Sequence, residues 1–121
     1  MKTINILEKF THINSYWHPH QIATVDDMQV ILARIKGEFV WHRHEEEDEL
    51  FQVIKGTLFM QFRDRTEVVQ EGELIVVPKG VEHCPATAED EEVLLLLFER
   101  KSTSHTGQIQ HELTKTEYPK I

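Results

Sequence analysis

Cysteine is almost absent from this chain, since Cys84 is the only one among 121 residues. A single cysteine excludes a disulfide within the chain and is typical of proteins kept in a reducing compartment. The first ten residues lack an apolar core followed by a small-residue cleavage site, so we do not expect a signal peptide. Together these absences predict a cytoplasmic protein.

Long apolar runs and clustered positive charge are also missing. The longest apolar run covers residues 93–98, whereas a membrane-spanning helix needs about 20 residues. The chain has 21 acidic and 13 basic residues, a net charge of −8, and no lysine or arginine cluster. Nucleic acids and anionic membrane surfaces both bind concentrated positive charge. We therefore expect neither a nucleic-acid partner nor a membrane partner.

Glycine is scarce, and four of the five glycines lie in two stretches that also hold the candidate metal ligands. The first stretch, residues 37–56, contains His42 and His44 two positions apart and Glu49 five positions later. Alternate residues of a β-strand share one face, so both imidazoles point the same way if residues 38–44 form a strand. Glu49 would open the next strand. Two neutral imidazoles and a carboxylate are a common ligand set for a divalent first-row transition metal.

His83 ends the second stretch, residues 72–83, and is the fourth candidate ligand. Imidazole suits zinc, copper, iron and nickel, whereas a carboxylate favours harder ions such as manganese. We predict one divalent transition metal, namely iron, manganese, nickel or zinc, and the ligand types do not choose among them. Imidazoles bind metal in their neutral form, so occupancy should fall as the pH drops through the histidine range.

The two stretches resemble the paired motifs of the cupin superfamily. The matching positions are Gly37, His42, His44, Glu49 and Gly56 in the first motif and Gly72, Pro78, Gly80 and His83 in the second. Two departures stand out: Thr87 occupies the position of the usual asparagine, and Gly37 lies one residue closer to the first histidine than the family pattern has it. The resemblance implies an all-β, single-domain jelly-roll barrel with the metal inside its mouth.

The strand pattern of the chain fits that architecture. Expected strands, rich in branched residues and separated by turn residues, cover residues 21–25, 28–36, 38–44, 49–54, 57–63, 66–70, 73–77, 81–85 and 93–100. The Lys55-Gly56 connection suits a tight hairpin. Residues 3–10 predict a short helix with Ile4 and Leu7 on one side and Phe10 as a further candidate there, followed by an irregular segment over 11–20. We expect one domain over 1–121, with a barrel core at about 21–99 and a tail at 100–121.

The strand over residues 93–100 also bears on assembly. Every position from 93 to 98 is apolar, so both faces of this strand require burial. The outer face must meet another sheet, the N-terminal segment or a second subunit. Because two-fold dimers are the commonest soluble oligomers, a homodimer is the favoured expectation.

For several residues the sequence allows two interpretations of their role. Asp48 is the alternative to Glu49 as a ligand, and residues 45–47 are expected to face solvent. His18 and His20 form a second H-x-H pair, either in an exposed loop or at the mouth of the cavity. Glu49 either stays a ligand or detaches to act as a catalytic base. Apolar residues that could line a pocket, although they are core residues first, are Phe51, Met60, Phe62 and Phe98.

The resemblance implies a range of activities, because cupins include dioxygenases, isomerases, epimerases, decarboxylases, lyases and non-catalytic binders. The favoured hypothesis is a metal-dependent enzyme of the dioxygenase, isomerase or lyase type that acts on a small oxygen-bearing molecule. One alternative is a non-enzymatic protein that binds a small molecule or a sugar. Another is a sugar-phosphate isomerase resembling phosphomannose isomerases. The last requires cations near the pocket, and the nearby candidates are Arg34, Lys36, Arg43 and Arg63.

Overall fold

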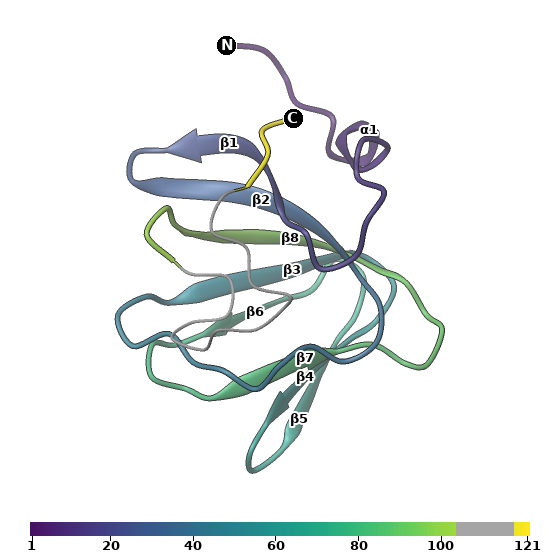
Figure 1. The fold of residues 1–121 in the computed structure, drawn as a ribbon, viewed down its shortest axis with the longest axis vertical. Helices are drawn as coiled ribbons and strands as arrows, with labels where there is room; N and C mark the ends of the chain where they lie inside the picture. The colour runs from purple at the N-terminus through teal and green to yellow at the C-terminus, as the bar shows by residue number, and fades with distance from the viewer. Residues whose placement is uncertain (104–117) are drawn as a thin grey trace.

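Two antiparallel sheets face each other in the computed structural model, which describes residues 1–103 and 118–121. The larger sheet has the strand order β1-β2-β8-β3-β6 and the smaller one β5-β4-β7 (Figure 1). The elements are α1 Ile6–Phe10, β1 His20–Val25, β2 Met28–Ile35, β3 Glu49–Lys55, β4 Leu58–Phe62, β5 Thr66–Val69, β6 Leu74–Val77, β7 His83–Ala86 and β8 Val93–Arg100. This arrangement confirms the predicted all-β jelly-roll barrel. The organisation of residues 1–121 as one domain stays a prediction.

The core lies between the two sheets and follows the two-residue period of the strands. On β2 the inward positions are Ile31, Ala33 and Ile35, and each is buried. β3 contributes Phe51 and Val53 to the same core, as expected from the position of Glu49 at the start of that strand. The alternation therefore determines which side chains face the interior, where the candidate ligands also lie.

The expected strand over residues 38–44 is not formed. This segment makes only two isolated bridges, Glu38 to Ala86 and His42 to His83, and the register shifts by one residue between them. Pro85 lies between the two bridged positions of β7 and has no N–H to donate, so a regular ladder cannot continue there. The segment is nevertheless placed so that His42 and His44 are buried while Arg43 between them is exposed.

The prediction of a tight hairpin at Lys55-Gly56 is also wrong. β3 pairs with β6 and β8, whereas β4 pairs with β5 and β7, so the connection passes from one sheet to the other. Gly56 has φ +92°, and a Cβ added there would lie 2.9 Å from the backbone oxygen of Glu92. The glycine therefore permits a close crossing between the sheets rather than a two-strand turn. By contrast, Asp26-Asp27 does connect the paired strands β1 and β2, which agrees with the turn expected between the strands over residues 21–25 and 28–36.

The N-terminal segment covers the outer face of β8. Phe10 and Ile13 are buried against Leu32 and Leu94, and Leu96 packs at the margin of this cluster. The helix within residues 3–10 is confirmed as the single turn α1, although Leu7 stays 62% exposed instead of packing inward. Because the segment covers this face, burial of β8 no longer requires a second subunit. The homodimer stays a prediction.

The C-terminal end of the chain lies against β1 and close to α1 (Figure 1). Gln21 N donates to Pro119 O at 2.7 Å, and Ile121 N donates to Gln21 O at 3.0 Å. The expected tail thus begins inside β8 and ends on the barrel, while residues 104–117, with His105 and His111, fall outside the described residues.

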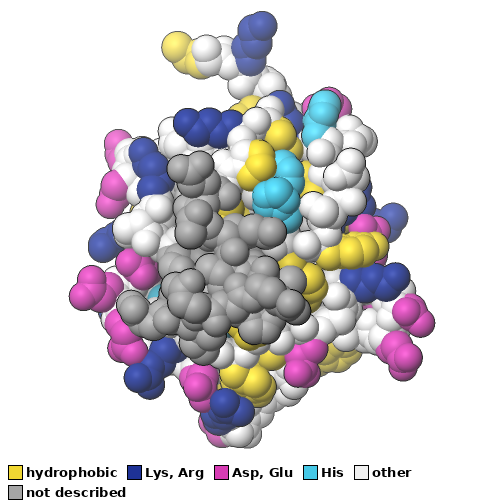
Figure 2. All heavy atoms as spheres, viewed as in Figure 1, with side chains coloured by type: hydrophobic (Ala, Val, Ile, Leu, Met, Phe, Trp, Pro, Cys, Tyr) yellow, Lys and Arg dark blue, Asp and Glu magenta, His cyan; other side chains and the backbone are white. Residues whose placement is uncertain are grey.

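In the part of the chain that is described, no helix has the length and apolar character needed to cross a membrane. Acidic and basic side chains are interspersed around the face seen in Figure 2.

Candidate metal centre

The four predicted ligands come together inside the barrel. One donor atom from each of His42, His44, Glu49 and His83 lies within 4.8 Å of the others, and all four side chains are buried. His42 and His44 come from the irregular segment before β3, while Glu49 and His83 are the first residues of β3 and β7. Residues from both sequence motifs therefore share one site.

Backbone hydrogen bonds hold the two motifs together at the ligands themselves. His42 N donates to His83 O at 3.0 Å, and His83 N donates to His42 O at 2.9 Å. Gly80 N donates to His44 O at 2.7 Å, which ties the turn before β7 to the second histidine. The positions of three imidazoles are thus determined by main-chain contacts as well as by side-chain packing.

Hydrogen bonds to backbone carbonyls fix the orientation of the His42 and His83 imidazoles. The Nδ1 atoms of His42 and His83 lie 2.9 Å from Val40 O and Val81 O, respectively. A carbonyl oxygen can only accept, so each Nδ1 carries the proton and each Nε2 carries the lone pair. A second-sphere hydrogen bond of this kind is typical of metal-ligating histidines.

The centre contains buried polar atoms without a hydrogen-bond partner among the described residues, namely His44 Nδ1, His44 Nε2, His83 Nε2 and Glu49 Oε1. The Nε2 atoms of His44 and His83 lie 3.3 and 3.7 Å from Glu49 Oε1, but no hydrogen bond forms between them. Buried polar atoms are nearly always paired, so a group of them facing one another calls for a shared partner. The donor set and these convergent atoms fit a divalent metal ion.

Protonation in the metal-free site mostly favours the metal-binding forms. Burial, with His83 close by, lowers the pKa of His42 to about 4. Burial acts against the charge of Glu49 as well, but His44 and His83 outweigh it and hold the pKa of that carboxyl well below its usual range. Burial would likewise lower the pKa of His44, but Glu49 outweighs it and raises that pKa. At neutral pH His42 is neutral and Glu49 is charged, as ligation requires.

The other polar residues considered from the sequence lie outside the four-residue cluster. Asp48 is exposed, and its Oδ1 accepts from Lys79 N at 2.9 Å, so it does not belong to the cluster. Residues 45 and 46 are exposed as expected, but Glu47 is half-buried and accepts from the Ser102 hydroxyl at 3.3 Å. His18 and His20 have ring centroids 4.8 Å apart, and neither lines the cavity described next.

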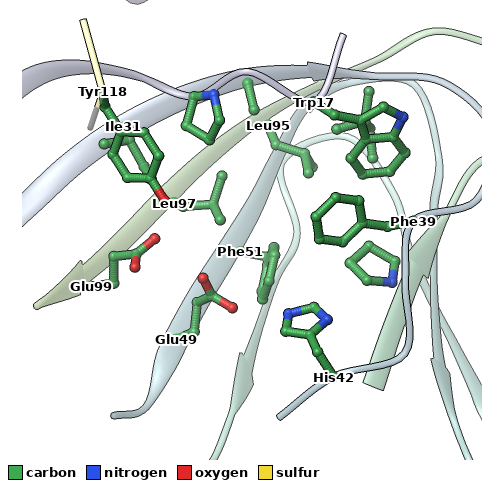
Figure 3. Close-up of a pocket in the computed structure, with 14 residues that line it drawn as sticks. Trp17, Ile31, Phe39, His42, Glu49, Phe51, Leu95, Leu97, Glu99 and Tyr118 are labelled. Atoms are coloured by element: carbon green, nitrogen blue, oxygen red, sulfur yellow. The ribbon is translucent and has the colours of Figure 1, made fainter. Parts of the chain in front are cut away.

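A cavity of about 40 Å³ opens beside the centre (Figure 3). This is room for about three water-sized groups. Its polar lining residues are His42, Glu49, Glu99 and Tyr118. Its walls are apolar, formed by Trp17, Pro19, Ile31, Ala33, Ile35, Phe39, Phe51, Pro85, Leu95 and Leu97. The space next to the centre therefore suits a small molecule that is largely apolar.

Phe51 is the only apolar pocket candidate from the sequence that lines this cavity. Met60 and Phe62 are buried in the core away from it, and Phe98 lies half-buried on the opposite parity of β8 from Leu97 and Glu99.

Several lining residues were missed from the sequence, among them Trp17, Phe39, Glu99 and Tyr118. Trp17 stacks on Phe39 at a centroid distance of 4.7 Å, and Phe39 in turn meets the edge of His42 at 5.5 Å. Glu99 could have been found, because it is a charged residue at an inward position of an otherwise apolar strand. Tyr118 could not have been predicted from the sequence, since the segment around it has neither a motif nor a clear hydrophobic periodicity.

Glu49 and Glu99 face each other at one end of the cavity, and the Tyr118 hydroxyl points toward the same end (Figure 3). Burial raises the pKa of Glu99 well above its usual range, and the adjacent Glu49 raises it further. Burial also raises the pKa of Tyr118, assisted by the two carboxyl groups. Apart from His42, the polar part of the cavity is thus built from acidic and phenolic groups.

Comparison with known proteins identifies the family. Residues 30–99, more than half of the chain, match the model of the cupin domain. The chain belongs to the cupin family. Both motifs fall within the matched region, as do the strands from β2 to β8 except for the first two residues of β2 and the last residue of β8, whereas α1 and β1 precede it. This cupin is also 35% identical over 83 residues to YdbB of Bacillus subtilis, covering 68% of this chain and 74% of YdbB.

Two solved structures resemble this cupin over most of their length. A cupin-2 domain protein from Shewanella frigidimarina is 44% identical, with a TM-score of 0.78, over 81% of this chain and 94% of its own. The protein NMB1881 from Neisseria meningitidis is 32% identical, with a TM-score of 0.73, over 83% of this chain and 100% of its own. These likenesses support the barrel and its family, and they name no substrate.

Proposed function

We propose that this cupin is a metal-dependent enzyme acting on a small oxygen-bearing organic molecule, with His42, His44, Glu49 and His83 holding one divalent transition-metal ion. The observation that supports this is the convergence of four buried donor atoms within 4.8 Å at the wall of an apolar cavity. A buried centre next to a cavity differs from a purely structural metal site, because a second molecule has access to it.

A metal bound here would supply Lewis-acid chemistry, polarising a carbonyl or hydroxyl oxygen of the substrate. Three imidazoles and one carboxylate would hold the ion, and this ligand set accepts iron, manganese, nickel or zinc. The reaction class is therefore a dioxygenase, an isomerase or a lyase.

The chain's own residues bind and shield the substrate. The Trp17, Phe39 and Phe51 rings form apolar walls that exclude water from the reacting group. Glu49 both belongs to the ligand cluster and lines the cavity, which makes it the candidate catalytic residue. It either remains a ligand or takes a proton from the substrate.

A sugar phosphate fits the cavity poorly. Phosphate recognition uses arginine or lysine, and neither lines the cavity among the described residues. Arg34 binds Glu92 and the Ile13 carbonyl, and Arg63 pairs with Glu82. Arg43 pairs with Glu45 and is exposed, while Lys36 lies over the Tyr16 ring. The four basic candidates are thus engaged elsewhere, which favours an uncharged substrate.

The test is turnover by the metal-loaded protein together with matched variants. The protein is loaded separately with iron, manganese, nickel and zinc. It is then assayed by oxygen uptake with diketone, thiol and catechol-like compounds and by product analysis with small hydroxyketones. We expect turnover with one metal, loss in His42→Ala with the fold retained by circular dichroism, and no change in His12→Ala. His12 is exposed, pairs with Glu8 and does not belong to the four-residue cluster, so it serves as the histidine control.

Unchanged turnover in His42→Ala would refute the metal-dependent mechanism. A compound that raises the melting temperature of the loaded protein without being consumed would indicate instead a non-enzymatic binder of small molecules or sugars. A cytoplasmic location, a homodimer and the absence of a nucleic-acid partner stay predictions.

A further inference from the structure

Glu99 is a buried polar residue that lies beside the candidate metal centre without belonging to its four-residue cluster. Its side chain is 1% exposed, and its Oε2 atom has no hydrogen-bond partner among the described residues. A buried carboxyl group without full hydrogen bonding is costly, so such a group needs a reason to be retained. Glu99 is not among the four clustered ligands, and it lines the cavity rather than the core between the sheets.

Apart from Glu99, the inward positions of β8 are apolar. Val93, Leu95 and Leu97 fill the other inward positions of the strand, and Leu97 lies beside Glu99 in the cavity wall. A leucine at residue 99 would continue that apolar face with a similar volume. Replacing buried polar groups by apolar groups of similar shape is often neutral or stabilising. The carboxyl is therefore expected to lower the stability of the protein without ligand.

The geometry of the cavity indicates what the Glu99 carboxyl contacts. The Glu49 and Glu99 carboxyl groups lie next to each other, and the cavity runs from this pair along apolar walls (Figure 3). A molecule that reaches the metal centre through an oxygen atom therefore has its neighbouring atoms next to Glu99. The described lining contains no lysine or arginine that could neutralise an anionic group there. A hydroxyl group suits the site best, because it can both donate and accept and so matches either form of a carboxyl group.

We propose that Glu99 is a specificity-determining residue that hydrogen-bonds a hydroxyl group of a small, uncharged substrate, adjacent to the oxygen that reaches the metal. This proposal rests on the proposed function, since it places the substrate between the metal centre and Glu99. It narrows the substrate class to hydroxylated molecules without carboxylate or phosphate groups.

The experiment compares two probes of nearly equal shape, hydroxyacetone and butan-2-one, which differ by a hydroxyl in place of a methyl group. The protein is loaded with Mn²⁺, and the paramagnetic relaxation of the methyl protons of each probe reports binding near the metal. Wild type is compared with Glu99→Leu, Glu99→Gln and the control Glu67→Gln, an exposed residue of β5. Metal content is measured on every sample.

We expect wild type and Glu67→Gln to bind hydroxyacetone in preference to butan-2-one. In Glu99→Leu the preference should fall by about tenfold, the loss of one hydrogen bond to a polar or charged group. Glu99→Gln should retain part of it, because an amide still bonds a hydroxyl. A preference unchanged in Glu99→Leu would mean that the hydroxyl contacts only the metal, and this would overturn the role of Glu99. Failure of both probes to bind loaded wild type would overturn it too.

A second measurement separates function from structure at this position. The metal-free Glu99→Leu protein should melt about 3 °C or more above wild type, since a buried polar group is replaced by an apolar one. A lower melting temperature would show that the carboxyl is structural and would overturn the proposal. Wild type that takes up no Mn²⁺ would instead refute the proposed metal centre, so the two failures are distinguishable.

Discussion

His42 and His83 exchange both of their backbone hydrogen bonds, at 3.0 and 2.9 Å, and their rings lie 4.3 Å apart between centroids. The pair joins the segment before β3 to the first residue of β7, 41 positions later in the chain. Formation of the site therefore depends on the closing of the barrel. The same pairing keeps two imidazoles close together in a buried place, where a charge on His42 is unfavourable.

The burial of His42, together with the nearby His83, predicts a pH dependence of stability in the metal-free protein. The pKa of His42 is lowered from 6.5 to about 4 in the folded protein. Between pH 6.5 and pH 4, His42 is therefore mostly protonated in the unfolded chain and mostly neutral in the folded protein. Stability is thus complete above pH 6.5 and is lost as the pH falls toward 4. Between pH 7 and pH 5 the contribution of His42 to this loss should be about 2 kcal/mol.

Urea denaturation with a chelator present, at pH 7 and pH 5, measures the effect. His42→Asn should lose less stability than wild type over that interval, and His12→Ala should lose as much as wild type. An equal loss in wild type and His42→Asn would contradict the lowered pKa of His42.

Gly56 is predicted to be intolerant of a side chain. Gly56→Ala places a Cβ 2.9 Å from Glu92 O in a backbone with φ +92°, so strain and overlap add. Gly72→Ala is the matched control, because its φ is +83° but nothing lies within 4 Å of its Cβ. We expect Gly56→Ala to lower the free energy of unfolding by at least about 1 kcal/mol more than Gly72→Ala does. Equal urea midpoints for the two variants would show that the sheets adjust at this crossing.

Thr87 is predicted to stabilise the start of the segment that carries His42 and His44. Gly37 N donates to Thr87 Oγ1 at 2.8 Å, and Thr87 N donates to Gly37 O at 2.9 Å. Thr87→Val keeps the shape but removes the acceptor, and should cost about 1 kcal/mol of unfolding free energy. Thr87→Ser keeps the hydroxyl and should cost less. A thermal melt in which the valine and serine variants behave alike would contradict this role.

Much of the site was predictable because its signals are local. The spacing of His42 and His44, the position of Glu49 at a strand start and the glycine-framed stretch before His83 all place side chains by short-range geometry. These residues do converge, and the alternation along β3 correctly placed Phe51 and Val53 inside. The barrel followed from strand spacing together with the resemblance to cupins.

The errors concern contacts between distant segments. Lys55-Gly56 has the composition of a hairpin turn, but sheet membership depends on which strands β3 and β4 meet later in the chain. The segment before β3 lost its regular ladder because of Pro85, far away in sequence. Tyr118 lines the cavity only because the last residues lie against β1. No local pattern encodes such pairings.

Metal content is the measurement that tests the central claim most directly. Untagged protein, reconstituted in turn with iron, manganese, nickel and zinc and then desalted, is analysed by elemental mass spectrometry beside the His42→Ala/His83→Ala double variant and His12→Ala. The account predicts about one equivalent of one of these metals in wild type and His12→Ala, and its loss in a double variant that still shows the β-sheet circular dichroism of wild type. Metal that stays at the same stoichiometry in the folded double variant, or that never binds wild type after reconstitution, would contradict a centre built from these histidines.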